Sequence, residues 1–200
     1  MQAADKIPDS DILSLWQAAD QAQAEAQERY PAMACRSGCN DCCKHHGSPM
    51  TYAREWELIV NWLAERPELL GRIQARFNAL KISLQTRLGE PKVPSLSEAL
   101  FEVPCPCIET VAGRELCGIY PVRPLTCRTF GNTLLVSPAD SQDAIYTCNP
   151  EKARWEQELP MLSELALPQR SEFFAQLEQQ DQRRSLLSFL ERWLKQRPLA

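Results

Sequence analysis

Nine cysteines, gathered in two stretches of the chain, constrain this sequence more than any other feature. Four of them lie within nine residues and five follow after a long gap: Cys35, Cys39, Cys42 and Cys43, then Cys105, Cys107, Cys117, Cys127 and Cys148. In a reducing compartment, thiols this close bind a soft metal ion or an iron–sulfur cluster. An odd number of cysteines also argues against a complete set of disulfides. The pattern therefore predicts a thiolate metal site.

The expected compartment follows from the first residues and from the apolar runs. Residues 1–10 are polar and acidic, without the basic and apolar segments of a secretory signal. No apolar run approaches the length of a membrane span. We therefore expect a cytoplasmic protein with no membrane partner. A net charge of −4 and a pI near 5.4 provide no basic field for a phosphate backbone, so we expect no nucleic-acid partner.

The distribution of apolar residues predicts the fold class. It is a mainly α single domain over residues 1–200, with a small, irregular α+β cysteine-rich centre organised by metal. The apolar share of 44% is enough for a core of ordinary size. We expect a cysteine-cluster metal-binding region, residues 31–150, flanked by helices 10–29 and 150–196.

Further helices are predicted by apolar spacing. The first helix carries apolar residues at Leu13, Trp16, Ala19 and Ala22. A second helix begins at Thr51 and stops before Pro67, and a third runs from Pro67 to Gly89. In the final helical block the apolar stripe is interrupted around residues 181–184, which predicts either a break into two helices or one helix with a solvated middle.

Between residues 90 and 149 the helical periodicity disappears. Ile108–Val111 and Leu116–Tyr120 can form a hairpin, and Thr133–Val136 and Ala144–Thr147 a second pair. Two-stranded ribbons are marginally stable in water, so something other than a sheet core must hold this region. Bound metal would do so, and we expect metal binding to be coupled to folding.

The spacing of the cysteines leaves the number of sites open. Short spacers let several sulfurs converge on an ion whose metal–sulfur bonds are about 2.3 Å long. The adjacent Cys42 and Cys43 project in different directions, which suits separate centres. Eight cysteines would complete either two four-thiolate sites or one such site with a second dithiol set. Zinc and an iron–sulfur cluster both accept this ligation.

Two other interpretations of this region are weaker. His45 and His46 follow the first cysteines directly, and we interpret them as a polar surface pair rather than as ligands. Cys105-Pro106-Cys107 can form a redox-active pair, but its nearness to three further cysteines favours metal ligation. The sequence shows no constellation of residues that identifies an enzyme.

Two motifs carry a family resemblance. They are Cys35-x3-Cys39-x2-Cys42-Cys43 and the segment from Cys117 to Arg128, which reads Cys-Gly-Ile-Tyr-Pro-Val-Arg-Pro-Leu-Thr-Cys-Arg. With these motifs, residues 35–148 resemble the YkgJ-type cysteine-cluster proteins, whose domain is described as zinc- or iron-chelating. The resemblance implies a ligand set of eight: Cys35, Cys39, Cys42, Cys43, Cys105, Cys117, Cys127 and Cys148. Cys107 departs from the pattern, so it is either a buried thiol or exchanges roles with Cys105.

The resemblance extends to flagellin lysine N-methylases, which share this cysteine domain and are implied to carry an iron–sulfur cluster. We therefore expect an iron–sulfur cluster first and zinc second, in a protein with a redox or accessory role. The alternatives are a structural zinc-binding interaction module, which would have a protein partner, and a metal storage or delivery protein. A role in lysine methylation is the weakest alternative, because no Gly-rich strand–turn–helix is present to hold S-adenosylmethionine.

Overall fold

The computed structural model describes residues 9–31, 35, 38–88, 103–135, 144–158 and 167–196. Most of these residues are helical and the strands are short, which confirms the mainly α prediction. The chain packs as two compact units, each built from two separate segments. Unit 1 comprises Met1–Cys39 and Pro124–Gln182, and unit 2 comprises Asn40–Arg123 and Arg183–Ala200. Assignment of the whole chain to one domain stays a prediction.

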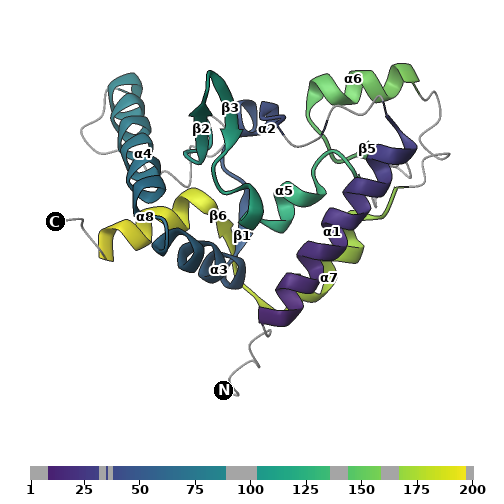
Figure 1. Ribbon diagram of the computed structural model, residues 1–200, viewed down its shortest axis with the longest axis horizontal. Coiled ribbons are helices and arrows are strands. Elements are labelled where there is room, and N and C mark those ends of the chain that lie inside the picture. The colour runs from purple at the N-terminus through teal and green to yellow at the C-terminus, as the bar shows by residue number, and fades with distance from the viewer. Residues whose placement is uncertain are drawn as a thin grey trace. The chain divides into compact units, whose positions relative to one another are not determined.

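Unit 1 is built on one long helix. Its elements are α1 (Asp9–Arg29), α5 (Leu125–Thr129), β4 (Leu134–Leu135), β5 (Ala144–Ile145), α6 (Asn149–Glu158) and α7 (Arg170–Gln180). The short helix α5 packs against α1, and β4 pairs with β5 in an antiparallel ribbon (Figure 1). The predicted second strand pair is therefore present, although only two residues long in each strand.

One face of α1 supplies much of the unit 1 core. Its buried apolar residues recur at helical spacing, at Ile12, Trp16, Ala19 and Ala26. Trp16 and Ala19 are buried as predicted, whereas Leu13 is 51% exposed and Ile12 is buried instead. The guanidinium of Arg128 lies 4.5 Å from the centre of the Trp16 ring and pairs with the carboxylate of Asp20. This contact fixes α5, and with it Cys127, on α1.

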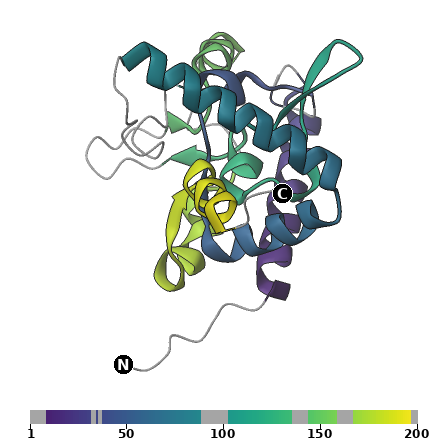
Figure 2. The ribbon, with the colours of Figure 1, turned by 90° about the vertical axis from the view of Figure 1, so that its left-hand side faces the viewer.

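Unit 2 contains the remaining elements. They are α2 (Asp41–His45), β1 (Met50–Tyr52), α3 (Ala53–Ala64), α4 (Pro67–Leu88), β2 (Ile108–Val111), β3 (Arg114–Cys117), the 3-10 turn η1 (Tyr120–Val122), β6 (Arg183–Ser185) and α8 (Leu186–Gln196). Helix α3 contacts both α4 and α8 (Figures 1 and 2). The rings of Trp56 and Phe189 stack with their centres 5.8 Å apart, which joins α3 to α8.

The interruption predicted near residues 181–184 is a true break in the helix. Residues 183–185 form β6, which pairs antiparallel with β1 so that Tyr52 lies opposite Arg183. The side chain of Glu55 accepts a hydrogen bond of 3.0 Å from the backbone N–H of Tyr52 and so caps α3. Helix α3 therefore begins at Ala53, because Thr51 is used in β1 rather than as a helix start.

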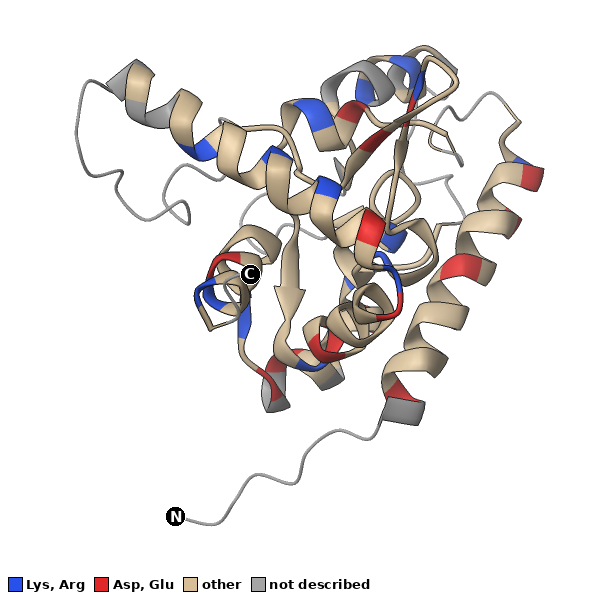
Figure 3. Cartoon of the chain, turned by 60° about the vertical axis from the view of Figure 1, so that its left-hand side comes forward, with Lys and Arg blue, Asp and Glu red and all other residues tan. Residues whose placement is uncertain are grey.

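The predicted hairpin in the cysteine-rich region is confirmed. Strand β2 pairs with β3, and the turn contains Ala112 and Gly113 at φ values of 49° and 77°. Most charged residues of α1 are acidic and most charged residues of α4 are basic (Figure 3). Among the described residues, no helix combines the length and the apolar character that a membrane span needs.

Candidate metal centre

Among the described residues no cysteine is part of a disulfide, and the nine cysteines are divided between the two units. Unit 1 holds Cys35, Cys39, Cys127 and Cys148, and unit 2 holds Cys42, Cys43, Cys105, Cys107 and Cys117. The early group, compact in sequence, is therefore split between Cys39 and Cys42. Each unit combines two early cysteines with later ones, so segments far apart in the sequence contribute to both.

Backbone hydrogen bonds hold the five cysteines of unit 2 on one framework. The N–H of Cys105 donates to the carbonyl oxygen of Cys43 at 2.8 Å, and the N–H of Gly118 donates to that of Cys107 at 2.7 Å. Cys117 lies opposite Ile108 in the hairpin. On α2 the sulfurs of Cys42 and Cys43 are 4.0 Å apart. Helix α2, the hairpin and the Cys105–Cys107 turn are thus directly connected.

Side chains reinforce the contact between α2 and β3. Lys44 forms an ion pair with Glu115, and Asn40 Nδ2 donates a 2.9 Å hydrogen bond to the carbonyl oxygen of Glu115. Both groups of the ion pair are partly exposed, so solvent screens it and its contribution to stability is small. Its main effect is to fix which face of α2 lies toward the hairpin.

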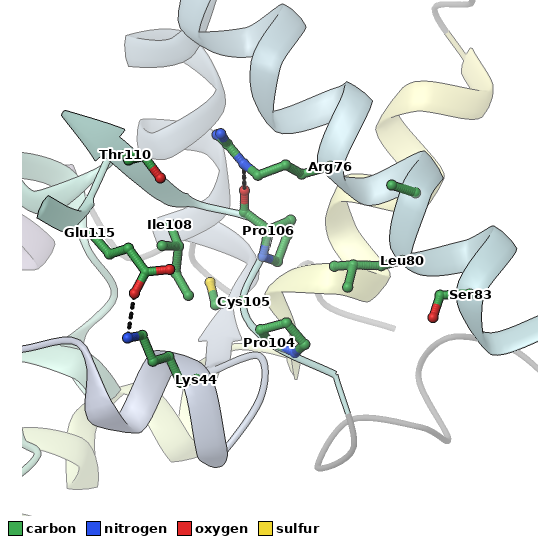
Figure 4. Close-up of a pocket in the computed structure, with 11 residues that line it drawn as sticks. Lys44, Arg76, Leu80, Ser83, Pro104, Cys105, Pro106, Ile108, Thr110 and Glu115 are labelled. Carbon is green, nitrogen blue, oxygen red and sulfur yellow. Dashed lines mark hydrogen bonds and ion pairs between the residues drawn. The ribbon is translucent and has the colours of Figure 1, made fainter. Parts of the chain in front are cut away.

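Helix α4 holds the Cys105–Cys107 turn from the other side. Arg76 Nε donates a 2.9 Å hydrogen bond to the carbonyl oxygen of Pro106, as the dashed line in Figure 4 shows. The same guanidinium pairs with Glu109, whose second oxygen accepts from Arg72 Nε at 2.7 Å. The Glu109 side chain is only 8% exposed, so this carboxylate is nearly buried and needs its two arginines.

The thiols of unit 2 act on one another electrostatically. A hydrogen bond from Cys107 lowers the pKa of Cys105, with a further contribution from the positive charge of Arg76. The same hydrogen bond and burial raise the pKa of Cys107 well above its usual value. Burial, and then the negative charge of Cys105, raise the pKa of Cys117 to about 12. A hydrogen bond with Cys43 lowers the pKa of Cys42.

Cys105 also lines an open cleft of about 720 Å³. Figure 4 shows its sulfur between Pro104 and Ile108, with the Lys44–Glu115 ion pair on one side and Leu80 of α4 on the other. The residue itself is only 6% exposed. The cleft therefore gives small molecules a route toward a thiol that is otherwise buried.

The cysteines of unit 1 lie on segments that meet at Gly131. The thiol of Cys35 donates to the carbonyl oxygen of Phe130 at 3.1 Å, and a Cβ at Gly131 would lie 2.6 Å from the Cβ of Cys35. The same Cβ would lie 3.6 Å from the Oγ1 of Thr147, the residue before Cys148. Gly131 has a φ of 89°, which only glycine adopts readily. Cys35 thus contacts the segment that follows α5, and Gly131 in that segment lies close to Thr147.

In no part of the described chain do three Cys, His, Asp or Glu side chains already converge on one point with metal-binding geometry. The donor chemistry nevertheless suits a soft metal, because each unit gathers several thiols and no disulfide competes for them. To hold metal, the thiol side chains must turn toward a common point, since the backbone segments are already joined. The eight-ligand set stays a prediction.

Other residues singled out in the sequence have structural partners. Arg123 donates to the carbonyl oxygen of Tyr120 at 3.0 Å, and Arg128 pairs with Asp20. His45 is exposed at the end of α2. Cys107, which departs from the family pattern, lies inside the unit 2 group at 3% exposure. The sequence signal that could have placed Cys107 in this group is its spacing of two residues from Cys105.

Comparison with known proteins gives a family and no individual relative. Residues 34–158 match the family CxxCxxCC, described as "Putative zinc- or iron-chelating domain". The searches of curated proteins and of solved structures each gave no match. The matched segment covers more than half of the chain and contains all nine cysteines. The protein therefore belongs to the CxxCxxCC family, whose domain is described as zinc- or iron-chelating.

Proposed function

We propose that this protein carries a thiolate-ligated iron–sulfur cluster and serves in electron transfer or as a redox-linked accessory protein. The observation that carries the proposal is the group of five cysteines, none of them in a disulfide, whose segments backbone hydrogen bonds hold together in unit 2. An iron–sulfur cluster bound by cysteine thiolates takes up and releases electrons at a potential set by nearby hydrogen bonds, charge and solvent exposure.

Two features near Cys105 suit this role. The positive charge of Arg76 offsets part of the negative charge that thiolate ligands bring. The cleft beside Cys105 provides an approach for an electron donor or acceptor. A closed structural zinc site needs neither of these features.

The test is anaerobic purification followed by iron, acid-labile sulfide and zinc analysis. We expect iron and sulfide together, with a visible chromophore that a reductant bleaches reversibly. Iron and sulfide both absent after reconstitution would contradict the proposal. A colourless protein with slowly exchanging zinc would instead identify a structural interaction module, and rapid loss of metal to a competing chelator would identify a storage or delivery protein.

A further inference from the structure

We infer that Cys105 and Cys107, in the metal-free protein, form a thiol–disulfide exchange pair that reacts with an acidic, low-molecular-weight disulfide entering the cleft beside Cys105. The inference goes beyond metal binding, because it concerns these two thiols when no metal holds them. It joins two observations within unit 2. One is the tight turn that carries both cysteines, and the other is a cleft that Cys105 lines and Cys107 does not.

The Cys105–Cys107 turn is short enough for a disulfide to close it. The N–H of Ile108 donates to the carbonyl oxygen of Cys105 at 3.3 Å, which makes a four-residue turn with Pro106 and Cys107 at its centre. A disulfide spans Cα atoms about 4.4–6.8 Å apart, and the first and third residues of such a turn lie within that range. Pro106 also restricts the backbone, so closing the bridge costs little further conformational entropy.

Neighbouring elements hold this turn in place from two sides. The N–H of Cys105 donates to the carbonyl oxygen of Cys43 at 2.8 Å, which ties the turn to α2. Arg76 Nε donates to the carbonyl oxygen of Pro106 at 2.9 Å, which ties it to α4. Both hydrogen bonds use backbone groups of the turn. The side-chain sulfurs therefore take no part in fixing it and can change partners without dismantling it.

Access distinguishes the two thiols. The sulfur of Cys105 lies between Pro104 and Ile108 on the wall of the cleft, whose volume is about 720 Å³ (Figure 4). Cys107 is 3% exposed and is not among the residues that line this cleft. Exchange begins with attack by the sulfur that an incoming disulfide can reach. The geometry therefore makes Cys105 the attacking thiol and Cys107 the resolving one.

The residues that line the cleft indicate the class of disulfide. Lys44 and Arg76 carry two positive charges, against one negative charge on Glu115. The hydroxyls of Ser83 and Thr110 can hydrogen-bond to a polar ligand. The volume is in the range of sites that hold small molecules. The net positive lining favours a small acidic molecule, and glutathione disulfide, which carries carboxylates, is a probe of this class.

The reaction has two exchange steps. The sulfur of Cys105 attacks one sulfur of the added disulfide, whose S–S bond breaks, and the first small thiol leaves with the proton that Cys105 gives up. The sulfur of Cys107 then attacks the Cys105 sulfur of this mixed disulfide, and the second small thiol leaves with the proton from Cys107. The added disulfide is thus reduced by two electrons to two thiols, and the two protein thiols are oxidised to one internal disulfide.

The test treats the full chain, freed of metal by a chelator, with glutathione disulfide and follows its tryptic peptides by mass spectrometry. No Lys or Arg lies between Cys105 and Cys107, so both fall in one peptide. We expect this peptide to gain one glutathione and then to lose it as the internal disulfide forms. A disulfide from Cys105 to another cysteine would overturn the inference. So would a peptide that stays reduced while the exposed Cys39 reacts.

Two serine variants test the order of attack. In Cys107→Ser the resolving thiol is gone, so we expect the reaction to stop with one glutathione on Cys105. In Cys105→Ser the attacking thiol is gone, and we expect Cys107 to react about tenfold more slowly than Cys105 does in the unsubstituted protein, because exchange depends on access. Equal rates for the two thiols, or a mixed disulfide that forms first on Cys107, would contradict the assignment.

Two tryptophan variants of α4 test the cleft as the route. Ser83 lines the cleft, whereas Asn78 is exposed on the same helix and is not among the lining residues. We expect Ser83→Trp to slow the reaction at Cys105 about tenfold by obstructing access, and Asn78→Trp to leave it unchanged. Equal rates in the two variants would show that the disulfide reaches Cys105 by another path.

A comparison of two reagents needs no substitution, so it remains decisive if a variant does not fold. Cystamine carries amines where glutathione disulfide carries carboxylates. Relative to Cys39, we expect Cys105 to favour glutathione disulfide over cystamine about threefold or more at low salt. The opposite preference would overturn the acidic class. Because every measurement uses the metal-free chain, failure of exchange leaves the metal-binding proposal standing, and a protein that binds no metal can still show exchange.

Discussion

The backbone N–H of Cys105 donates a 2.8 Å hydrogen bond to the carbonyl oxygen of Cys43. This bond joins the two cysteine-rich stretches of the sequence within unit 2. It needs no metal, because both groups belong to the backbone. The framework of the unit 2 group can therefore form from hydrogen bonds and packing, with metal completing the arrangement of side chains.

The two thiols of the Cys105–Cys107 turn are expected to have different roles. Cys107 donates a hydrogen bond that favours the thiolate of Cys105, so we expect Cys105 to be the ligand and Cys107 its supporting donor. We predict that Cys105→Ser lowers metal affinity at least tenfold, whereas Cys107→Ser, which keeps a hydroxyl donor, changes it less than threefold. These ratios correspond to about 1.4 and about 0.6 kcal/mol. Competition with a chelator of known affinity measures them, and the reverse order would assign Cys107 as the ligand.

Arg76 is expected to position the same turn. Arg76→Ala removes the hydrogen bond to Pro106 and leaves the nearly buried Glu109 with Arg72 as a partner, which should cost about 1–3 kcal/mol in the free energy of unfolding. We also predict weaker metal binding, because the turn loses its contact with α4. Urea unfolding and metal titration measure the two effects.

Arg72→Ala is the matched control for Arg76. Arg72 binds the same carboxylate but is 54% exposed, and no described hydrogen bond connects it to the cysteine turn. We expect a smaller loss of stability and unchanged metal affinity. If the two substitutions lowered metal affinity equally, metal binding would depend on the ion pairs to Glu109 and not on the hydrogen bond to Pro106.

Gly118 permits the close approach of the hairpin to Cys107. A Cβ at this position would lie 2.6 Å from Glu109 Cγ and 3.1 Å from the carbonyl oxygen of Cys107. Because Glu109 is held by two arginines, it cannot move aside easily, and we predict that Gly118→Ala destabilises the protein by about 1–3 kcal/mol.

Gly71→Ala is the control for this glycine effect. Gly71 lies within α4, and a Cβ there would have no heavy atom within 4 Å. Alanine has the higher helix propensity, so we predict a gain of about 0.5–1 kcal/mol. Chemical denaturation measures both variants. A Gly118→Ala protein as stable as the unsubstituted one would mean that the hairpin approaches Cys107 less closely than described.

The stability of the metal-free protein is expected to fall in alkaline solution. Burial raises the pKa of Cys117 to about 12 in the folded chain, so the folded state holds this proton more tightly than the unfolded state. This contribution is complete below the unfolded pKa and is lost as pH rises toward the folded pKa, at about 1.4 kcal/mol per pH unit for one proton.

Urea unfolding of the metal-free protein at several pH values above 9 tests this expectation, with Cys117→Ser as the control. The loss of stability should be smaller in the variant. Metal binding should show the opposite dependence, because each thiol ligand must release its proton, so affinity should rise with pH. A metal-free protein whose stability does not change over this range would contradict the burial of Cys117.

Helices with sustained apolar spacing were predictable from the sequence. Helix α4 follows from its apolar stripe and begins at Pro67, and the break before α8 follows from the loss of that stripe. The one-turn helices α2 and α5 were not predictable, because five residues are too few to show a period. These two short helices carry Cys42, Cys43 and Cys127. The sequence therefore identifies these cysteines as candidate ligands but does not predict the helices on which they lie.

The grouping of the cysteines depends on long-range contacts that local patterns do not encode. Sequence proximity suggests that Cys39 and Cys42 belong together, yet they fall in different units. The contact of Cys35 with Gly131 and the bond between Cys43 and Cys105 each join distant segments. The sequence allowed two four-thiolate sites as one arrangement, and the division of ligands stays a prediction.

X-ray absorption spectroscopy at the iron edge tests the central claim, thiolate-bound metal, most directly. Applied to the anaerobically reconstituted protein, it should show a first shell of sulfur alone at about 2.3 Å, together with scattering from neighbouring iron atoms. A sulfur-only shell at the zinc edge, without a neighbouring metal, would keep the thiolate site and reject the cluster. A first shell of nitrogen and oxygen would contradict the account.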